Sequence, residues 1–244
     1  MMRQLFLRAL LLLWCGGAAT AAAPDAAQLV AGVAGSWAPL EAALTATMTT
    51  RRPDREPSVT DLRILRGGQG RTRIEFLSPE RQRGKILLLL EDETWMYLPR
   101  PQRVVKVPLR HNPLSGSLLF EDLLPESFSE EGASVEETDD AYVLITSGRG
   151  KKKGSSDRIY FHRDTLMPFR REFHGKSGRL LKTIHVEETR SWKNVNIPWK
   201  IRFIDHLRGD IEAILEIHKA EELGQDTEYL FTREGFAPSG DLEG

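Results

Sequence analysis

The segment of residues 86–107, ILLLLEDETWMYLPRPQRVVKV, constrains the fold more than any other part of the chain. Its first part, the run ILLLL, is too short to span a bilayer and suits a strand that is apolar on both faces. Trp95 and Tyr97 then point to one face and Met96 and Leu98 to the other, because side chains alternate along a strand. Such strands need cover on both faces, so the fold must supply two layers of cover.

The first residues have the pattern of a secretory signal peptide. Arg3 and Arg8 form a positive leader, Leu5–Trp14 an apolar core and Ala19–Ala23 a small-residue cleavage region. We expect residues 1–23 to be removed, with cleavage between Ala19 and Pro24, and residues 24–244 to form one domain. The alternative is a short amphipathic helix of the mature domain.

Cys15 is the only cysteine of the chain, and it lies within the expected leader. Trp14 precedes it where the lipid-modifying pathway requires a small residue, so we expect no lipidation. The mature chain then has no disulfide and depends on its core alone.

Composition excludes several classes of protein. The formal net charge of −1 becomes −3 when Arg3 and Arg8 leave with the leader, and the charges are interspersed, which does not favour a nucleic-acid binder. Beyond the leader, no segment has the length of about 20 apolar residues that a transmembrane helix needs. We expect a soluble protein of an extracytoplasmic space.

After one short helix within Asp25–Trp37, alternating apolar and polar residues separated by turn residues predict about 10–11 strands. Arg52-Pro53-Asp54 and Lys193-Asn194 are two of the short turns, and they favour antiparallel neighbours. A second amphipathic helix is predicted at Ser117–Leu124. A sheet of this size tends to curl, and with so little helix it can cover its apolar face either by closing up or by folding lid helices over a concavity. If side chains do not fill the interior, a hydrophobic cavity remains.

Several strings resemble the LolA-like family of outer-membrane lipoprotein-sorting proteins. They are ETWMYLPRPQRVVKV followed by LLFEDLL, the meander RIYFHRDTLMPFRREFHGKSGRLLKTIHVEE, and IPWKIRFIDHLRGDIEAILEI followed by EYLFTREGF. The resemblance covers Leu40–Phe236, although the loop Pro113–Leu119 departs from the family pattern. It implies a mainly β fold, an incomplete antiparallel barrel with short lid helices over an apolar cavity. It also implies a periplasmic carrier that binds the acyl chains of a lipoprotein or lipid without catalysis or a cofactor. By resemblance its partners are an inner-membrane exporter of the ABC or RND type and a membrane acceptor.

The candidate ligand-binding residues are apolar side chains of the predicted strands and of the second helix. We expect them to line the cavity, although aromatic residues on strands also fill ordinary cores. They are Ile74, Phe76, Leu87, Leu89, Trp95, Tyr97, Leu119, Phe120, Trp199, Ile201, Phe203 and Leu215.

Lys151, Lys152 and Lys153 lie in a glycine-flanked loop that lacks the order of a phosphate-binding P-loop. We predict a contact of these lysines with anionic headgroups or an acidic partner, against the alternative of a solvated loop. The six histidines have no metal-site spacing, the chain has no GxSxG motif, and the acidic residues between Glu130 and Asp140 suit a solvated loop.

Two other functions remain open from the sequence. The same fold can serve as a stress-sensing module that binds a membrane-bound regulator, and dispersed carboxylates can serve a lipid hydrolase.

Overall fold

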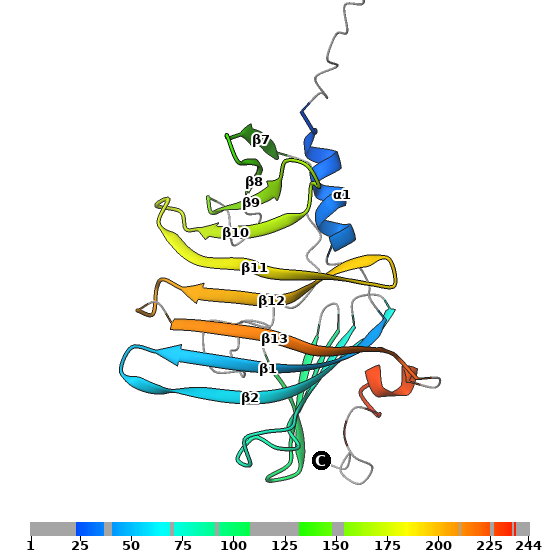
Figure 1. The fold of residues 1–244 in the computed structure, drawn as a ribbon. Helices are drawn as coiled ribbons and strands as arrows, with labels where there is room; N and C mark the ends of the chain where they lie inside the picture. Colours follow the sequence, from blue (N-terminus) through cyan, green and yellow to red (C-terminus); the bar gives the residue numbers. More distant parts are fainter. Residues whose placement is uncertain are drawn as a thin grey trace, which may run out of the picture.

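The computed structural model describes residues 23–36, 41–68, 71–90, 93–107, 132–147, 154–209, 211–224, 227–235 and 237. Thirteen strands in this part of the chain form one antiparallel sheet with the order β6-β5-β4-β3-β2-β1-β13-β12-β11-β10-β9-β8-β7 (Figure 1). The strands are β1 (Ala42–Arg52), β2 (Arg55–Arg66), β3 (Thr72–Phe76), β4 (Ile86–Leu89), β5 (Thr94–Leu98), β6 (Arg103–Lys106), β7 (Ser134–Glu137), β8 (Ala141–Ser147), β9 (Ser156–His162), β10 (Pro168–His174), β11 (Leu180–Trp192), β12 (Val195–Asp205) and β13 (Ile211–Glu222).

The sheet is curved and is not closed into a barrel. Its order ends at β6 on one side and β7 on the other, and all neighbours except β1 and β13 are consecutive in the sequence. The predicted mainly β, incomplete barrel is therefore confirmed. The strand count is higher than the expected 10–11, partly because β7 lies in the acid-rich segment that we predicted to be a solvated loop.

Two predicted hairpin turns are confirmed. The pairing of Arg52 with Arg55 closes the β1–β2 hairpin around Pro53 and Asp54. Between β11 and β12, Lys193 and Asn194 have φ values of 48° and 64°. Two consecutive left-handed residues form the type of two-residue turn whose twist matches that of antiparallel strands. Short turns of this kind set the registers of the long strands at the centre of the sheet.

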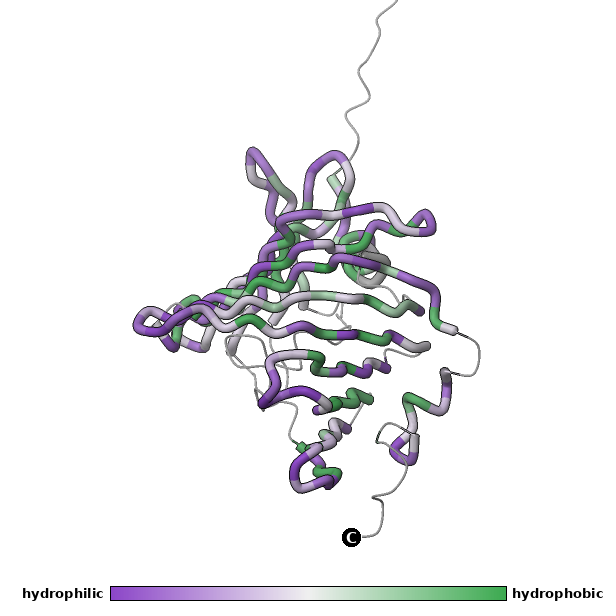
Figure 2. The backbone as a smooth tube through the Cα atoms, turned by 60° about the horizontal axis from the view of Figure 1, so that its bottom comes forward, coloured by the Kyte–Doolittle hydropathy of each residue, from purple (hydrophilic) through white to green (hydrophobic). Residues whose placement is uncertain are grey.

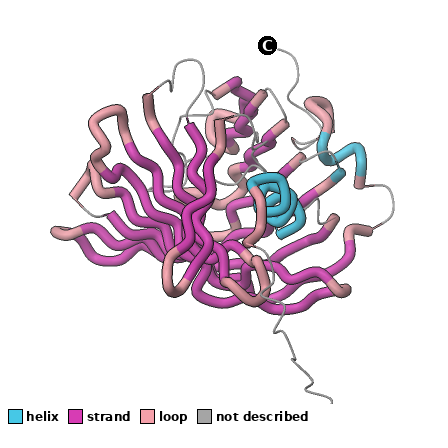
Figure 3. The backbone as a smooth tube through the Cα atoms, turned by 90° about the horizontal axis from the view of Figure 1, so that it is seen from above, coloured by secondary structure: helices cyan, strands magenta, loops and turns pink. Residues whose placement is uncertain are grey.

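One α-helix, α1 (Ala26–Ser36), lies in the described part of the chain, as the sequence predicted. Asp25 Oδ1 accepts a hydrogen bond from Gln28 N (2.8 Å), and Gln28 Oε1 accepts one from Asp25 N (3.1 Å). This reciprocal pair satisfies backbone donors that the first turn of a helix leaves open. Seen from above, the sheet curves around α1 (Figure 3).

The helix packs on the concave face of the sheet. Leu29 and Val33 of α1 contact a cluster that includes Leu144, Ile159 and Phe161 of β8 and β9. No helix in the described residues is long and apolar enough to cross a membrane.

Hydrophobic and hydrophilic positions alternate along the strands (Figure 2), and β4 is apolar on both faces. Leu87 and Leu89 belong to one buried cluster, whereas Ile86 and Leu88 belong to another. The second cluster includes Phe231 of the 3₁₀ helix η4 (Glu228–Phe231). The chain's C-terminal segment thus helps to cover the second apolar face that the sequence required.

Candidate ligand-binding wall

One large apolar cluster, which we call the inner wall, covers the concave face from β11 through β12, β13 and β1 to β5. This cluster lies on the same face as α1. Arg171 pairs with Ile159, which packs with α1, and also with Ile184, which belongs to the inner wall. Residues paired across strands point to the same face of a sheet. Its buried members are Ala42, Leu44, Ala46, Met48, Leu62, Ile64, Ile74, Phe76, Leu87, Leu89, Met96, Ile184, Ile197, Trp199, Ile201, Phe203, Ala213, Leu215 and Ile217.

The inner wall contains most of the candidate residues that lie in the described part of the chain. They are at most 9% exposed, and Ile74, Leu87, Leu89 and Phe203 are 0% exposed. The residues brought together are Ile74, Phe76, Leu87, Leu89, Trp199, Ile201, Phe203 and Leu215. Segments far apart in the sequence therefore join one continuous apolar surface.

Trp95 and Tyr97 lie on the opposite face and do not join the inner wall. They belong to the cluster of Ile86, Leu88 and Phe231, which we call the outer cluster; its other buried members are Leu65 and Ala237. Between them, Met96 points to the inner wall, and Leu98 packs against it. The sequence predicts correctly that side chains of β5 alternate between two faces. Both faces carry apolar residues, however, so the sequence does not indicate which of them belongs to the inner wall.

The side chain of Trp95 is held in place by polar groups of the outer face. Trp95 Nε1 donates to Glu93 Oε2 (3.1 Å), and the guanidinium of Arg233 lies 4.5 Å from the ring centre. The hydrogen bond from Lys106 and, to a smaller extent, the one from Trp95 hold the pKa of Glu93 below its ordinary value. This arrangement fits a structural role for Trp95 on the outer face.

The remaining candidates lie outside the described residues: Leu119 and Phe120, with the whole predicted helix Ser117–Leu124, and the three lysines Lys151, Lys152 and Lys153. Their roles stay predictions.

Charged side chains border the inner wall. Arg171 Nη2 lies 2.5 Å from Asp157 Oδ2, and its guanidinium lies 4.2 Å from the ring centre of Phe173. Near the end of β11, the guanidinium of Arg190 lies 4.7 Å from the ring centre of Trp199 on β12. The sequence does not single out these arginines, because each lies among charged or polar residues without a distinctive pattern.

The convex face of the central strands carries ion pairs instead of apolar residues. Arg202 lies between Glu187 and Glu212 and forms an ion pair with each. The hydrogen bond from Arg202 holds the pKa of Glu187 below its ordinary value. This part of the sheet therefore has a charged convex face and an apolar concave face.

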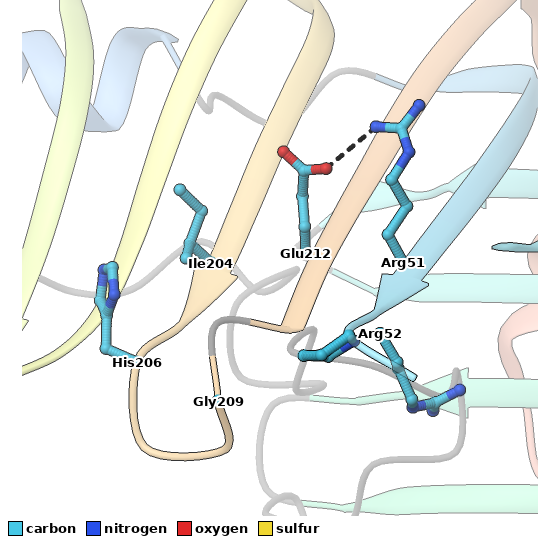
Figure 4. Close-up of a pocket in the computed structure, with 7 residues that line it drawn as sticks. Arg51, Arg52, Ile204, His206, Gly209 and Glu212 are labelled. Carbon is cyan, nitrogen blue, oxygen red and sulfur yellow. Dashed lines mark hydrogen bonds and ion pairs between the residues drawn. The ribbon is translucent and has the colours of Figure 1, made fainter. Parts of the chain in front are cut away.

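A separate open pocket of about 630 Å³ lies between the β1–β2 and β12–β13 hairpins (Figure 4). Its lining residues are Arg51, Arg52, Pro53, Ile204, His206, Gly209 and Glu212. Because Ile204 and Glu212 follow and precede the inner-wall residues Phe203 and Ala213, they belong to the convex face. The pocket is therefore distinct from the inner wall.

The described residues offer no group of three or more His, Cys, Asp or Glu side chains that could hold a metal ion. What the inner wall can do is bury hydrocarbon, which needs apolar area and no chemical step.

An open, curved antiparallel sheet with a helix in its concavity and an apolar inner wall defines the LolA-like class of fold. A LolA superfamily protein from Nitrosomonas europaea has a TM-score of 0.70 and 18% identity, covering 87% of this chain and 99% of its own. A putative outer membrane lipoprotein-sorting protein domain from Vibrio parahaemolyticus has a TM-score of 0.70 and 19% identity, covering 86% and 95%. A DUF1329 family protein from Desulfovibrio piger has a TM-score of 0.71 and 15% identity, covering 86% and 99%.

These likenesses confirm the predicted resemblance to LolA-like proteins at the level of the fold. A family model described as "Uncharacterized protein"-like matches residues 68–236, and the chain belongs to that family. No curated protein matches the sequence.

Proposed function

We propose that this protein is a carrier that binds the acyl chain of a lipid or lipoprotein against the inner wall and transfers it between membranes. The observation that supports this proposal most strongly is the inner wall itself, on the concave face of an open sheet. The LolA-like fold supports it as well, because similar structures include a putative lipoprotein-sorting domain.

The physical need for such a carrier follows from the cost of exposing hydrocarbon to water. An acyl tail of about 16 carbons, at about 0.8 kcal/mol per methylene, costs on the order of 10 kcal/mol to expose. Transit between membranes without cover is therefore negligible. An apolar concavity offsets this cost by burial alone, so the proposed function includes no catalysis and no cofactor.

The predicted leader supports a periplasmic location, where acyl chains must cross an aqueous space. The resemblance suggests an inner-membrane exporter of the ABC or RND type that loads the carrier, and a membrane acceptor that unloads it. Within this proposal, α1 acts as a movable cover of the concavity, because it packs on the concave face.

The tryptophans allow a test that distinguishes the two faces of the sheet. Trp199 lies in the inner wall, whereas Trp95 packs with the outer cluster. Two variants, each with a single tryptophan at 199 or 95 and phenylalanine at the others, are titrated with a brominated fatty acid. Bromine quenches indole fluorescence only at short range, so we expect quenching of Trp199 and not of Trp95.

Equal quenching at both positions would indicate non-specific adsorption and contradict the proposal. Mass spectrometry of organic extracts from the purified protein provides a second readout, with the expected result of a bound lipid or acyl chain. Protein that is always empty and leaves the fluorescence of Trp199 unchanged would refute acyl carriage.

A further inference from the structure

The pocket between the β1–β2 and β12–β13 hairpins offers basic groups to a ligand. Arg51 and Arg52 of the first hairpin and His206 of the second hairpin are among its lining residues. Arg51 extends towards Glu212, whereas the side chain of Arg52 points in another direction (Figure 4). Arg51 is 53% exposed at its side chain. Guanidinium groups bind phosphate well because they present several donors in one plane.

The acid in the pocket is already neutralised. Glu212 Oε2 accepts a hydrogen bond from Arg51 Nη1 (2.9 Å), and its other oxygen accepts one from Arg202. Arg52 has no such acidic partner among the described residues. The pocket therefore presents Arg52 and the remaining donors of Arg51 to an anion.

An exposed leucine lies next to the pocket, in the turn that follows β12. Leu207 is 56% exposed, among the most exposed large apolar side chains of the described residues. The turn is ordered, because Leu207 N donates to Asp205 Oδ1 (3.0 Å) and His206 N donates to Leu181 O (2.9 Å). The exposure of this leucine side chain to water is unfavourable. Its insertion into an apolar surface would remove that unfavourable contribution to the free energy.

We propose that this end of the sheet docks on a membrane surface, with the phosphate of an anionic phospholipid in the pocket and Leu207 in the lipid interface. Basic residues beside an exposed apolar side chain match the chemistry of that surface. Asp54 and Glu56 on the first hairpin are exposed and limit the attraction, so docking is reversible. This site goes beyond the proposed acyl binding, because it lies on the convex face.

The test is flotation of the full chain with vesicles of phosphatidylcholine alone and of phosphatidylcholine with phosphatidylglycerol. We expect binding to the mixed vesicles and much weaker binding to phosphatidylcholine alone. Arg52→Gln is expected to reduce the partition coefficient about fivefold, and Leu207→Ser about tenfold. Matched controls are Lys219→Gln, on β13 towards its other end, and Tyr229→Ser, on η4, whose side chain is 58% exposed; both should bind like the wild type.

Wild-type binding by both Arg52→Gln and Leu207→Ser, or equal binding of the wild type to both kinds of vesicle, would overturn the proposal. Inorganic phosphate that abolishes binding of the wild type while Leu207→Ser has no effect would identify a site for soluble phosphate, and would overturn docking as well. Quenching of Trp199 by brominated fatty acid in solution should be unchanged in both variants, so failure of docking and failure of acyl carriage are distinguishable.

Discussion

Glu172 on β10 is a buried carboxylate that depends on its neighbours to stay ionised. It is 6% exposed, and its Oε2 accepts a hydrogen bond from Tyr160 (3.0 Å) and lies 3.1 Å from His174 Nε2. Burial raises the pKa of Glu172, but the hydrogen bonds from His174 and Tyr160 and the charge of Arg170 outweigh burial and leave the pKa below its ordinary value. Burial and the nearby Glu172 raise the pKa of Tyr160.

We predict that Glu172→Gln lowers the free energy of unfolding by about 2 kcal/mol at neutral pH, since hydrogen bonds to a charged group are lost. A lowered folded-state pKa stabilises the protein above the ordinary pKa of the carboxyl, near 4.5, and this contribution is lost as pH falls through the folded-state value. The difference between wild type and variant should therefore shrink below about pH 4.5. Denaturant unfolding at neutral and acidic pH measures it.

Glu188→Gln is the matched control, because Glu188 forms an exposed pair with Arg190 (2.6 Å). Its effect should stay within about 0.5 kcal/mol. A similar loss in both variants, or a difference that does not depend on pH, would contradict the role assigned to Glu172.

The elements of the fold differ in how far the sequence predicted them. The C-terminal meander was predictable because apolar residues alternate and the turns are short. β7 was missed because Val135 is its only apolar residue, which leaves no alternation to detect. The pairing of β1 with β13 joins Ala42–Arg51 to Glu212–Glu222, and no local pattern encodes a contact between such distant segments. The position of the inner wall depended on this pairing.

The start of helix α1 is readable in the sequence, because aspartate is a preferred N-cap residue and Asp25 directly precedes the helix. We predict that Asp25→Ala lowers the free energy of unfolding by about 1 kcal/mol, since the first turn loses the acceptor of its Gln28 N–H bond. Hydrogen exchange of the amides of α1 should accelerate, while exchange in β12 and β13 should not. Asp25→Asn keeps an acceptor and should behave like the wild type; equal acceleration in both variants would exclude capping as the cause.

At the scale of the whole molecule, the two faces of the sheet are covered in different ways. The residues of the inner wall lie on the concave face and are at most 9% exposed, whereas the outer cluster is covered by the chain's own C-terminal segment. Phe231 packs so closely that a Cβ atom on Gly67 would lie 2.9 Å from its ring. Leu65, Ile86, Leu88 and Tyr97 are at most 7% exposed under this cover. If the protein binds hydrocarbon as proposed, this cover leaves the concave face as the face for binding.

We therefore predict that a chain ending at Gly224 binds brominated fatty acid on both faces. Loss of Phe231 and Arg233 uncovers the outer cluster and the ring of Trp95, so the fluorescence of a truncated variant with Trp95 as its single tryptophan should now be quenched.

Phe231→Ala in the full chain is a milder change than this truncation, and it is expected to lower the free energy of unfolding by about 3 kcal/mol. Tyr229→Ser, at a side chain that is 58% exposed, is the control. Trp95 that stays unquenched in folded protein of both forms would show that the C-terminal segment does not provide the seal.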